Sequence, residues 1–295
     1  MVLIMVANRP EPKGLPMKLL LHACCGPCSL EPVRMLLAEG HSLTIYYANS
    51  NIYPAAEYDH RLQTLLDWAR AEGIAVVEGA YEPDRWEASA GAVGEALRKR
   101  SQAAEGGGAT DAQNIAETNA PTETAAHHVP SPDARTEPRC RACYRLRFQE
   151  AARYAVDHGF DGLATTLSVS PYQHTSAIEE ELSRAAQQAG IAAVFEDFRP
   201  FYPAATERSQ ALGMYRQNYC GCRFSLDEMQ TQRQERKRQR DRERARHQAE
   251  TAEERAREAE RTAARKAERA AYDAKQARKR AILKELRGQA PGDRD

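Results

Sequence analysis

The chain has 295 residues and equal numbers of basic and acidic side chains, 42 of each, so its formal net charge is zero. The charge is uneven: residues 227–295 hold 21 basic and 15 acidic residues, whereas residues 1–226 hold 21 and 27. No stretch is long and apolar enough for a transmembrane helix, and the apolar start Met1–Val6 lacks the basic region of a signal peptide. We therefore expect a cytoplasmic protein with no membrane partner and an N-terminal extension over residues 1–17.

From Lys18 onward, short apolar runs alternate with helical patterns of apolar residues, which indicates alternating strands and helices. The predicted strands cover residues 18–23, 43–48, 74–77, 163–169 and 191–195. The predicted helices cover residues 29–39 with Ser29 as N-cap, the segment from Pro54 to Gly73, and residues 84–100, 140–159, 176–190 with a capping box at Ser176 and Glu179, and 207–215. This order predicts an α/β fold, a Rossmann-like parallel sheet with helices on both faces.

Two segments differ from this pattern. Residues 101–139 contain three consecutive glycines and almost no large apolar residue, so we predict a disordered insertion within a domain of residues 18–226. From Asp227 the sequence has neither proline nor glycine until Gly288, which predicts a long charged helix in the tail of residues 227–295. Alanines recur there at heptad-like spacing, which suits a weak coiled coil or a solvated helix held by charge pairs.

The seven cysteines fall into three groups at the ends of predicted elements: Cys24, Cys25 and Cys28; Cys140 and Cys143; Cys220 and Cys222. An isolated cysteine usually packs as a small hydrophobe, but seven clustered thiols in a reducing compartment favour metal or redox chemistry. Paired C-x-x-C spacing suits zinc, whereas adjacent cysteines and C-x-C are unusual for zinc and leave iron–sulfur binding as the alternative. The spacing alone leaves both metals open.

Five segments of the chain, in order, resemble the QueH-type epoxyqueuosine reductases. They are Leu21–Cys28, Cys140–Arg147, Thr165–Gln173, Glu196–Pro200 and Tyr215–Cys222, and the resemblance covers residues 18–226. It implies an iron–sulfur oxidoreductase that reduces epoxyqueuosine to queuosine at the wobble position of tRNA, the last step of queuosine biosynthesis, without cobalamin.

The resemblance also implies roles for individual residues. It implies that Cys24, Cys25, Cys140 and Cys143 bind a [4Fe–4S] cluster, and that Cys220 and Cys222 form a redox-active catalytic pair. We expect contacts with the substrate from Tyr144, Arg147, Tyr172 and Arg199.

Reduction of an epoxide to an alkene and water needs two electrons and two protons, whereas one [4Fe–4S] cluster normally passes one electron. The dithiol of Cys220 and Cys222 can store two electrons, and a second, mononuclear iron with Cys28 as a ligand is the alternative store. Either store needs an electron donor that the sequence does not identify. The candidate proton donors are Tyr144, Tyr172, Asp197 and His22.

Two rival functions remain at this point. One is a zinc-binding module that binds tRNA without catalysis, and the other is a tRNA thiolation or thiol–disulfide enzyme. The sequence after the first strand lacks a Ser-Gly-Gly phosphate loop, which argues against ATP-dependent thiolation. For any tRNA partner, the block Arg233–Arg246, with eight basic and three acidic residues, is expected to contact phosphates.

Overall fold

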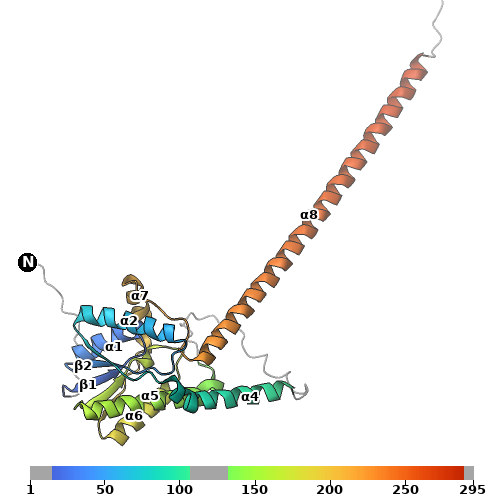
Figure 1. Cartoon of the computed structure of the whole chain (residues 1–295). Helices are drawn as coiled ribbons and strands as arrows, with labels where there is room; N and C mark the ends of the chain where they lie inside the picture. The colour runs from blue at the N-terminus through green and yellow to red at the C-terminus, as the bar shows by residue number, and fades with distance from the viewer. Residues whose placement is uncertain (1–14, 107–131, 289–295) are drawn as a thin grey trace, which may run out of the picture. The chain divides into compact units, whose positions relative to one another are not determined.

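A parallel sheet forms the centre of the domain (Figure 1). The computed structural model describes residues 15–106 and 132–288, and within them five strands pair in the order β3-β2-β1-β4-β5. The strands are β1 (Lys18–His22), β2 (Ser42–Tyr47), β3 (Ala75–Glu78), β4 (Gly162–Thr165) and β5 (Ala192–Val194). From β1 the chain adds β2 and β3 on one side, and it then adds β4 and β5 on the other side of β1. Leu20 in β1 therefore pairs with Thr44 of β2 on one side and with Leu163 of β4 on the other. Open sheets bind ligands at the carboxyl edge beside such a reversal.

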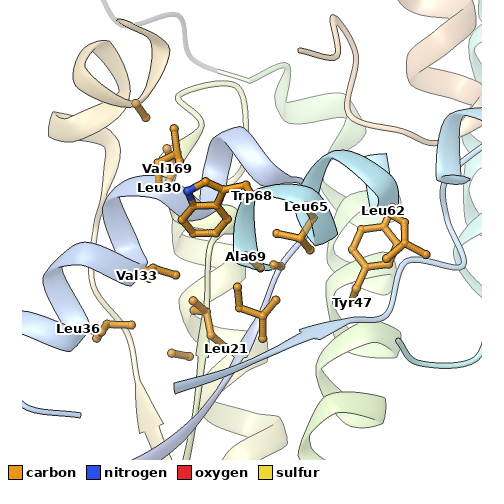
Figure 2. Close-up of a cluster of buried hydrophobic side chains, with 14 of the residues drawn as sticks. Leu21, Leu30, Val33, Leu36, Tyr47, Leu62, Leu65, Trp68, Ala69 and Val169 are labelled. Atoms are coloured by element: carbon orange, nitrogen blue, oxygen red, sulfur yellow. The ribbon is translucent and has the colours of Figure 1, made fainter. Parts of the chain in front are cut away.

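Helices cover both faces of this sheet, as predicted. On one face lie α1 (Gly26–Ala38), α2 (Ala55–Glu72) and α7 (Tyr202–Ala211), and on the other lie α5 (Glu137–Asp157) and α6 (Thr175–Ala189). Successive side chains of β1 point to opposite faces of the sheet. Leu19 and Leu21 pack with α1 and α2 in one core, whereas Leu20 packs with α5 and α6 in the other. Figure 2 shows Trp68 and Leu65 of α2 beside α1 in the first core.

The residues at which helices begin differ from the predicted ones more than other features of the fold do. Helix α1 begins at Gly26 instead of Ser29, because Pro27 suits the first helical turn, and the Ser29 hydroxyl donates a hydrogen bond to the Cys25 carbonyl at 2.8 Å. The predicted capping box at Ser176 is wrong, since α6 begins at Thr175 without a side-chain cap.

Two elements near the end of the domain are also displaced. Helix α7 covers Tyr202–Ala211 instead of 207–215, since Pro203 suits its first turn. Strand β4 ends at Thr165, and a 3-10 turn, η3 (Leu167–Val169), replaces the remainder of the predicted strand.

The helix predicted over residues 84–100 consists of three pieces. These are α3 (Pro83–Trp86), a π-helical turn η1 (Glu87–Gly91) and α4 (Ala92–Gly106). Helix α4 continues to Gly106, into the segment 101–139 that was predicted to be disordered, and η2 (Ala134–Thr136) leads directly into α5. Both borders of that segment are therefore helical, and residues 107–131 lie outside the described residues.

The predicted long charged helix is confirmed as α8 (Arg223–Gly288). Its first residues belong to the compact unit that ends at Met229, and residues 230–295 form a second unit. The described side chains of this second unit are almost all exposed, and pairs one turn apart such as Arg246–Glu250 and Arg257–Glu253 support the helix. Within residues 15–106 and 132–288, no helix combines the length and apolar character of a membrane span.

Candidate functional site

The first cysteine group spans the junction of β1 and α1, with Cys24 and Cys25 in the loop and Cys28 in the first turn of the helix. The Sγ atoms of Cys24, Cys25 and Cys28 all lie within 4.8 Å of one another, which is close enough to hold one metal ion. The pKa of the Cys24 thiol is held well below its ordinary value, because the Cys25 and Cys28 thiols hydrogen-bond to it. Burial instead raises the pKa of Cys25 to about 12. The group therefore favours one thiolate, at Cys24, which is the form of sulfur that metals bind.

The other four cysteines form a second group. Cys140 and Cys143 lie on the first turns of α5, and Cys220 and Cys222 lie in the loop before α8. Cys143 and Cys222 belong to one buried cluster. Burial raises the pKa of Cys140, and the charges of Cys220, Cys143 and Cys222 raise it further. Residues far apart in the chain thus meet at this site, and the predicted cluster ligands include two cysteines from each group.

Arg147 lies between the two cysteine groups. Its charge lowers the pKa of Cys24, and the same charge opposes the effect of burial on the pKa of Cys143. Its guanidinium donates a hydrogen bond to Asn49 Oδ1 at 2.5 Å, and Asn49 Nδ2 donates to the Ala23 carbonyl at 2.9 Å. Asn49 was missed by the sequence analysis, although a polar residue directly after an apolar strand was the available signal.

An apolar cluster covers the second group on one side. It contains Trp86, Ala90, Cys143, Cys222 and Phe224, which are all buried. Four buried nitrogen donors have no hydrogen-bond partner among the described residues, and three of them, Trp86 Nε1, Arg139 Nε and Arg147 Nε, belong to residues near these cysteines, whereas the fourth, Trp68 Nε1, lies in the first core. Unpaired buried donors beside thiols suit an anionic sulfur-bound group, since such donors stabilise the charge on the sulfur atoms.

A buried arginine holds the loop that carries Cys220 and Cys222. Arg61 of α2 is 1% exposed and donates to the carbonyl oxygens of Cys220 at 3.0 Å and Tyr219 at 3.2 Å. Its Nε donates to Glu57 at 2.7 Å. Gly221 has a φ of +131°, and a Cβ atom there would lie 3.2 Å from the Arg61 guanidinium, so glycine fits best. The sequence analysis missed Arg61, which occupies the same helix face as apolar residues.

The loop also reaches the first cysteine group. Gln217 Nε2 donates to Cys25 Sγ at 2.9 Å, and Gln217 Oε1 is buried without a partner among the described residues. All seven thiols are free, and among the described residues Cys24, Cys25 and Cys28 form the group whose sulfur atoms lie within 4.8 Å of one another, so the predicted ligands Cys140 and Cys143 are not part of that close group.

The part of the chain that is similar to known proteins contains all of these cysteines. A sequence model of the family described as "Epoxyqueuosine reductase QueH" matches residues 19–106 and 93–228, which include every cysteine. The chain belongs to this family.

Several curated proteins named "Epoxyqueuosine reductase QueH" are similar to the chain. The protein of Haemophilus influenzae is 29% identical over 222 residues, 74% of this chain and 75% of the relative. The protein of Dehalococcoides mccartyi is 28% identical over 208 residues, 70% of this chain and 92% of the relative. The protein of Histophilus somni is 28% identical over 221 residues, with coverages of 74% and 75%.

The residues expected to contact the substrate of a QueH protein divide by exposure. Tyr144 and Arg147 are buried, and the Tyr144 hydroxyl donates to Gln173 Oε1 at 2.6 Å. Tyr172 is 58% exposed, and Arg199 is partly exposed beside Asp197, whose carboxylate it contacts at 2.6 Å. Only the second pair is accessible to a macromolecule, whereas the first pair can contact only a group inserted into the site.

The candidate proton donors also divide by environment. His22 is fully buried, and burial followed by the charge of Arg147 lowers its pKa to about 3, so it is neutral at physiological pH. Burial followed by the charges of nearby thiols raises the pKa of Tyr144 well above its ordinary value, so its hydroxyl keeps its proton. Arg199 lowers the pKa of Asp197 through their hydrogen bonds, which favours the carboxylate. Among these three, Tyr144 is the group that carries a proton beside the cysteines.

Proposed function

We propose that this protein reduces epoxyqueuosine to queuosine in tRNA, in the cytoplasm. Membership of the QueH family supports the reaction. One observation about the site supports the assignment of this reaction to the cysteines. Cys24, Cys25 and Cys28 lie within 4.8 Å of one another, the charge of Arg147 acts on the pKa of Cys24 and Cys143, and unpaired buried donors belong to Trp86, Arg139 and Arg147. Free thiols in such number suit a reducing compartment.

Cys24, Cys25, Cys140 and Cys143 would hold a [4Fe–4S] cluster. When bound, such a cluster supplies electrons one at a time. The donors Trp86 Nε1 and Arg147 Nε, buried and unpaired, suit the charge of sulfur ligands at Cys143. Cys28 shares the first group with Cys24 and Cys25, which supports the alternative that it helps to bind a second, mononuclear iron.

Cys220 and Cys222 would act as the redox-active pair. Removal of the epoxide oxygen breaks two carbon–oxygen bonds, consumes two electrons and two protons, and releases water. Oxidation of the dithiol to a disulfide releases the same two electrons and two protons. Arg61 fixes the backbone of Cys220, and the Ser225 amide donates to Cys222 Sγ at 3.4 Å, so the pair is held in place. An external electron donor then restores the dithiol.

The substrate would approach the exposed edge of the site. Tyr172 and Arg199 are accessible there and would contact the tRNA. Tyr144 would supply a proton inside the site, since it stays protonated and its hydroxyl is positioned by Gln173.

The decisive experiment is anaerobic purification of the full chain, followed by metal analysis and reduction of tRNA that carries epoxyqueuosine. We expect bound iron and sulfide, and conversion to queuosine with a chemical reductant. Loss of queuosine from tRNA in a deletion strain, with accumulation of epoxyqueuosine, would be the matching result in cells. A colourless protein with zinc alone and no turnover would instead support the tRNA-binding module.

Cysteine variants separate the two proposed roles. Cys140→Ser should lose iron and sulfide, because it removes a cluster ligand. Cys222→Ser should keep both and lose turnover, because it removes only one member of the redox pair. Full iron content in Cys140→Ser would contradict the ligand assignment.

A further inference from the structure

Two exposed aromatic side chains stand out in the domain. Among residues 15–106 and 132–229, Tyr53 and Tyr172 are the aromatic residues with more than half of their surface exposed, 55% and 58%. Every other tryptophan, phenylalanine and tyrosine in that part of the chain is more buried. Exposed rings cost solvation free energy, so their common location matters.

Both tyrosines lie at the carboxyl edge of the sheet, on either side of the first cysteine group. Tyr53 follows β2 and Tyr172 follows β4, the two strands that pair with β1. The loop after β1 carries Cys24 and Cys25, and Cys28 follows in the first turn of α1. Because parallel strands end at the same edge, the segments that carry the two tyrosines lie on opposite sides of the cysteines along that edge.

The backbone of Tyr53 is fixed to the catalytic loop while its ring is free. Its N–H donates to the Gly221 carbonyl at 2.8 Å, and its own carbonyl accepts a hydrogen bond from the Tyr219 hydroxyl at 2.5 Å. Gly221 lies between Cys220 and Cys222, so the Tyr53 backbone is held directly beside the proposed redox pair. The Tyr172 backbone is held by its own N–H, which donates to Ser170 Oγ at 3.3 Å, and the Tyr172 ring meets the Tyr202 ring edge to face at 6.3 Å.

We propose that the Tyr53 ring stacks on a tRNA base next to the base being reduced, opposite Tyr172. The inference rests on the proposed tRNA reductase activity. Proteins recognise unpaired RNA bases largely by stacking them on aromatic side chains, and an exposed ring on a fixed backbone loses little entropy when it stacks. A modified base presented between two such rings would lie over the cysteine groups.

The test uses an anticodon stem-loop RNA with 2-aminopurine, whose fluorescence falls on stacking, on one or the other side of the wobble position. Wild-type protein should quench at both positions. Tyr53→Ala should weaken RNA binding about tenfold and lose quenching at one position, whereas Tyr53→Phe should keep both. Tyr272→Ala, which removes an exposed tyrosine in α8, is the matched control and should bind like the wild type.

The alanine variant keeps both backbone hydrogen bonds, so iron content and melting temperature should match the wild type. Unchanged affinity and quenching in Tyr53→Ala would overturn the inference. Turnover by the wild-type protein in the same experiment would show that the proposed function still holds. Lower affinity with loss of bound iron would also overturn it, since the ring would then serve the fold. Failure of the wild-type protein to bind or reduce tRNA would instead overturn the proposed function.

Discussion

Arg61 illustrates how one buried charge can organise a site. Its guanidinium satisfies two backbone carbonyls of the cysteine loop and one carboxylate of its own helix, and its side chain is almost fully enclosed. Glu57 receives a second hydrogen bond, from the Tyr215 hydroxyl at 2.6 Å. Loss of the arginine would therefore leave a mostly buried carboxylate and two carbonyl groups without their donor.

We expect Arg61→Met to lower the free energy of unfolding by about 3 kcal/mol, since removal of one partner of a buried pair is strongly destabilising. Denaturant unfolding of the metal-free protein measures this. Arg70→Met on the same helix is the control, because the Arg70 side chain is 76% exposed, and it should cost under about 0.5 kcal/mol. Equal costs for the two variants would contradict the role of Arg61.

His174 provides a test against pH. It is buried, Thr136 Oγ1 lies 3.0 Å from its Nε2, and burial lowers its pKa below the ordinary value of 6.5. The unfolded chain therefore binds a proton more readily, and stability present above about pH 6.5 is lost as the pH falls. In His174→Gln, the free energy of unfolding should fall less steeply below pH 6.5. Parallel curves for variant and wild type would argue against this.

At the scale of elements, the segment α3–η1–α4 forms a wall of the second cysteine group. Trp86 ends α3, and the π-helical turn follows immediately, as is frequent at functional sites. Arg223 at the start of α8 contacts Glu87 and Glu95 at 2.8 Å each, which fastens this wall to the cysteine loop. The wall keeps Cys143 and Cys222 away from water.

Gly94 is a closely packed point of that wall, because a Cβ atom there would lie 2.5 Å from the Phe224 ring. We expect Gly94→Ala to displace Phe224, to cost about 1–3 kcal/mol of stability, and to speed labelling of Cys143 and Cys222 by a thiol reagent in the metal-free protein. Ala96→Ser, on the exposed side of α4, should change neither quantity. Slow labelling identical to wild type would show that Phe224 does not shield the thiols.

The sheet and its helices could be predicted because local patterns determine them. Buried parallel strands are continuous apolar runs, and the cysteines directly follow the first of these, so their place at the carboxyl edge was predictable. Arg61 could not be predicted, since its partner Cys220 lies 159 residues away. The place of Asn49 directly after an apolar strand was a signal for a polar role, but its partner Arg147, 98 residues away, could not be predicted. The π-helical turn could not be predicted either. Packing against α5 and the contact with Arg223 of α8 stabilise this turn, whereas local sequence propensity does not specify it.

At the scale of the whole molecule, charge is divided between two units. The arginines near the cysteines are largely paired inside the domain: Arg139 with Glu228 at 2.7 Å, and Arg145 with Glu181 at 2.8 Å. Their charge is therefore mostly compensated, and they offer a polyanion little attraction. The uncompensated basic block Arg233–Arg246 remains the main candidate for attraction of tRNA phosphates at a distance.

We expect truncation after Met229 to weaken tRNA binding and to flatten its dependence on salt, while iron content stays unchanged. This boundary keeps Glu228, which pairs with Arg139, whereas truncation after Leu226 would remove it. The measurement is the dissociation constant against salt concentration for both chains. Identical slopes would show that the tail serves another purpose.

The spread of the cysteines along the chain affects how the protein is made. The first thiols are synthesised near the start of the domain and the last, Cys222, at its end, directly before α8. Under the proposed assignment, the cluster ligands Cys24, Cys25, Cys140 and Cys143 are all synthesised once translation passes Cys143, whereas the redox pair is complete only with Cys222. Because domains fold from the N-terminus during synthesis, the redox pair would be the last part of the site to form.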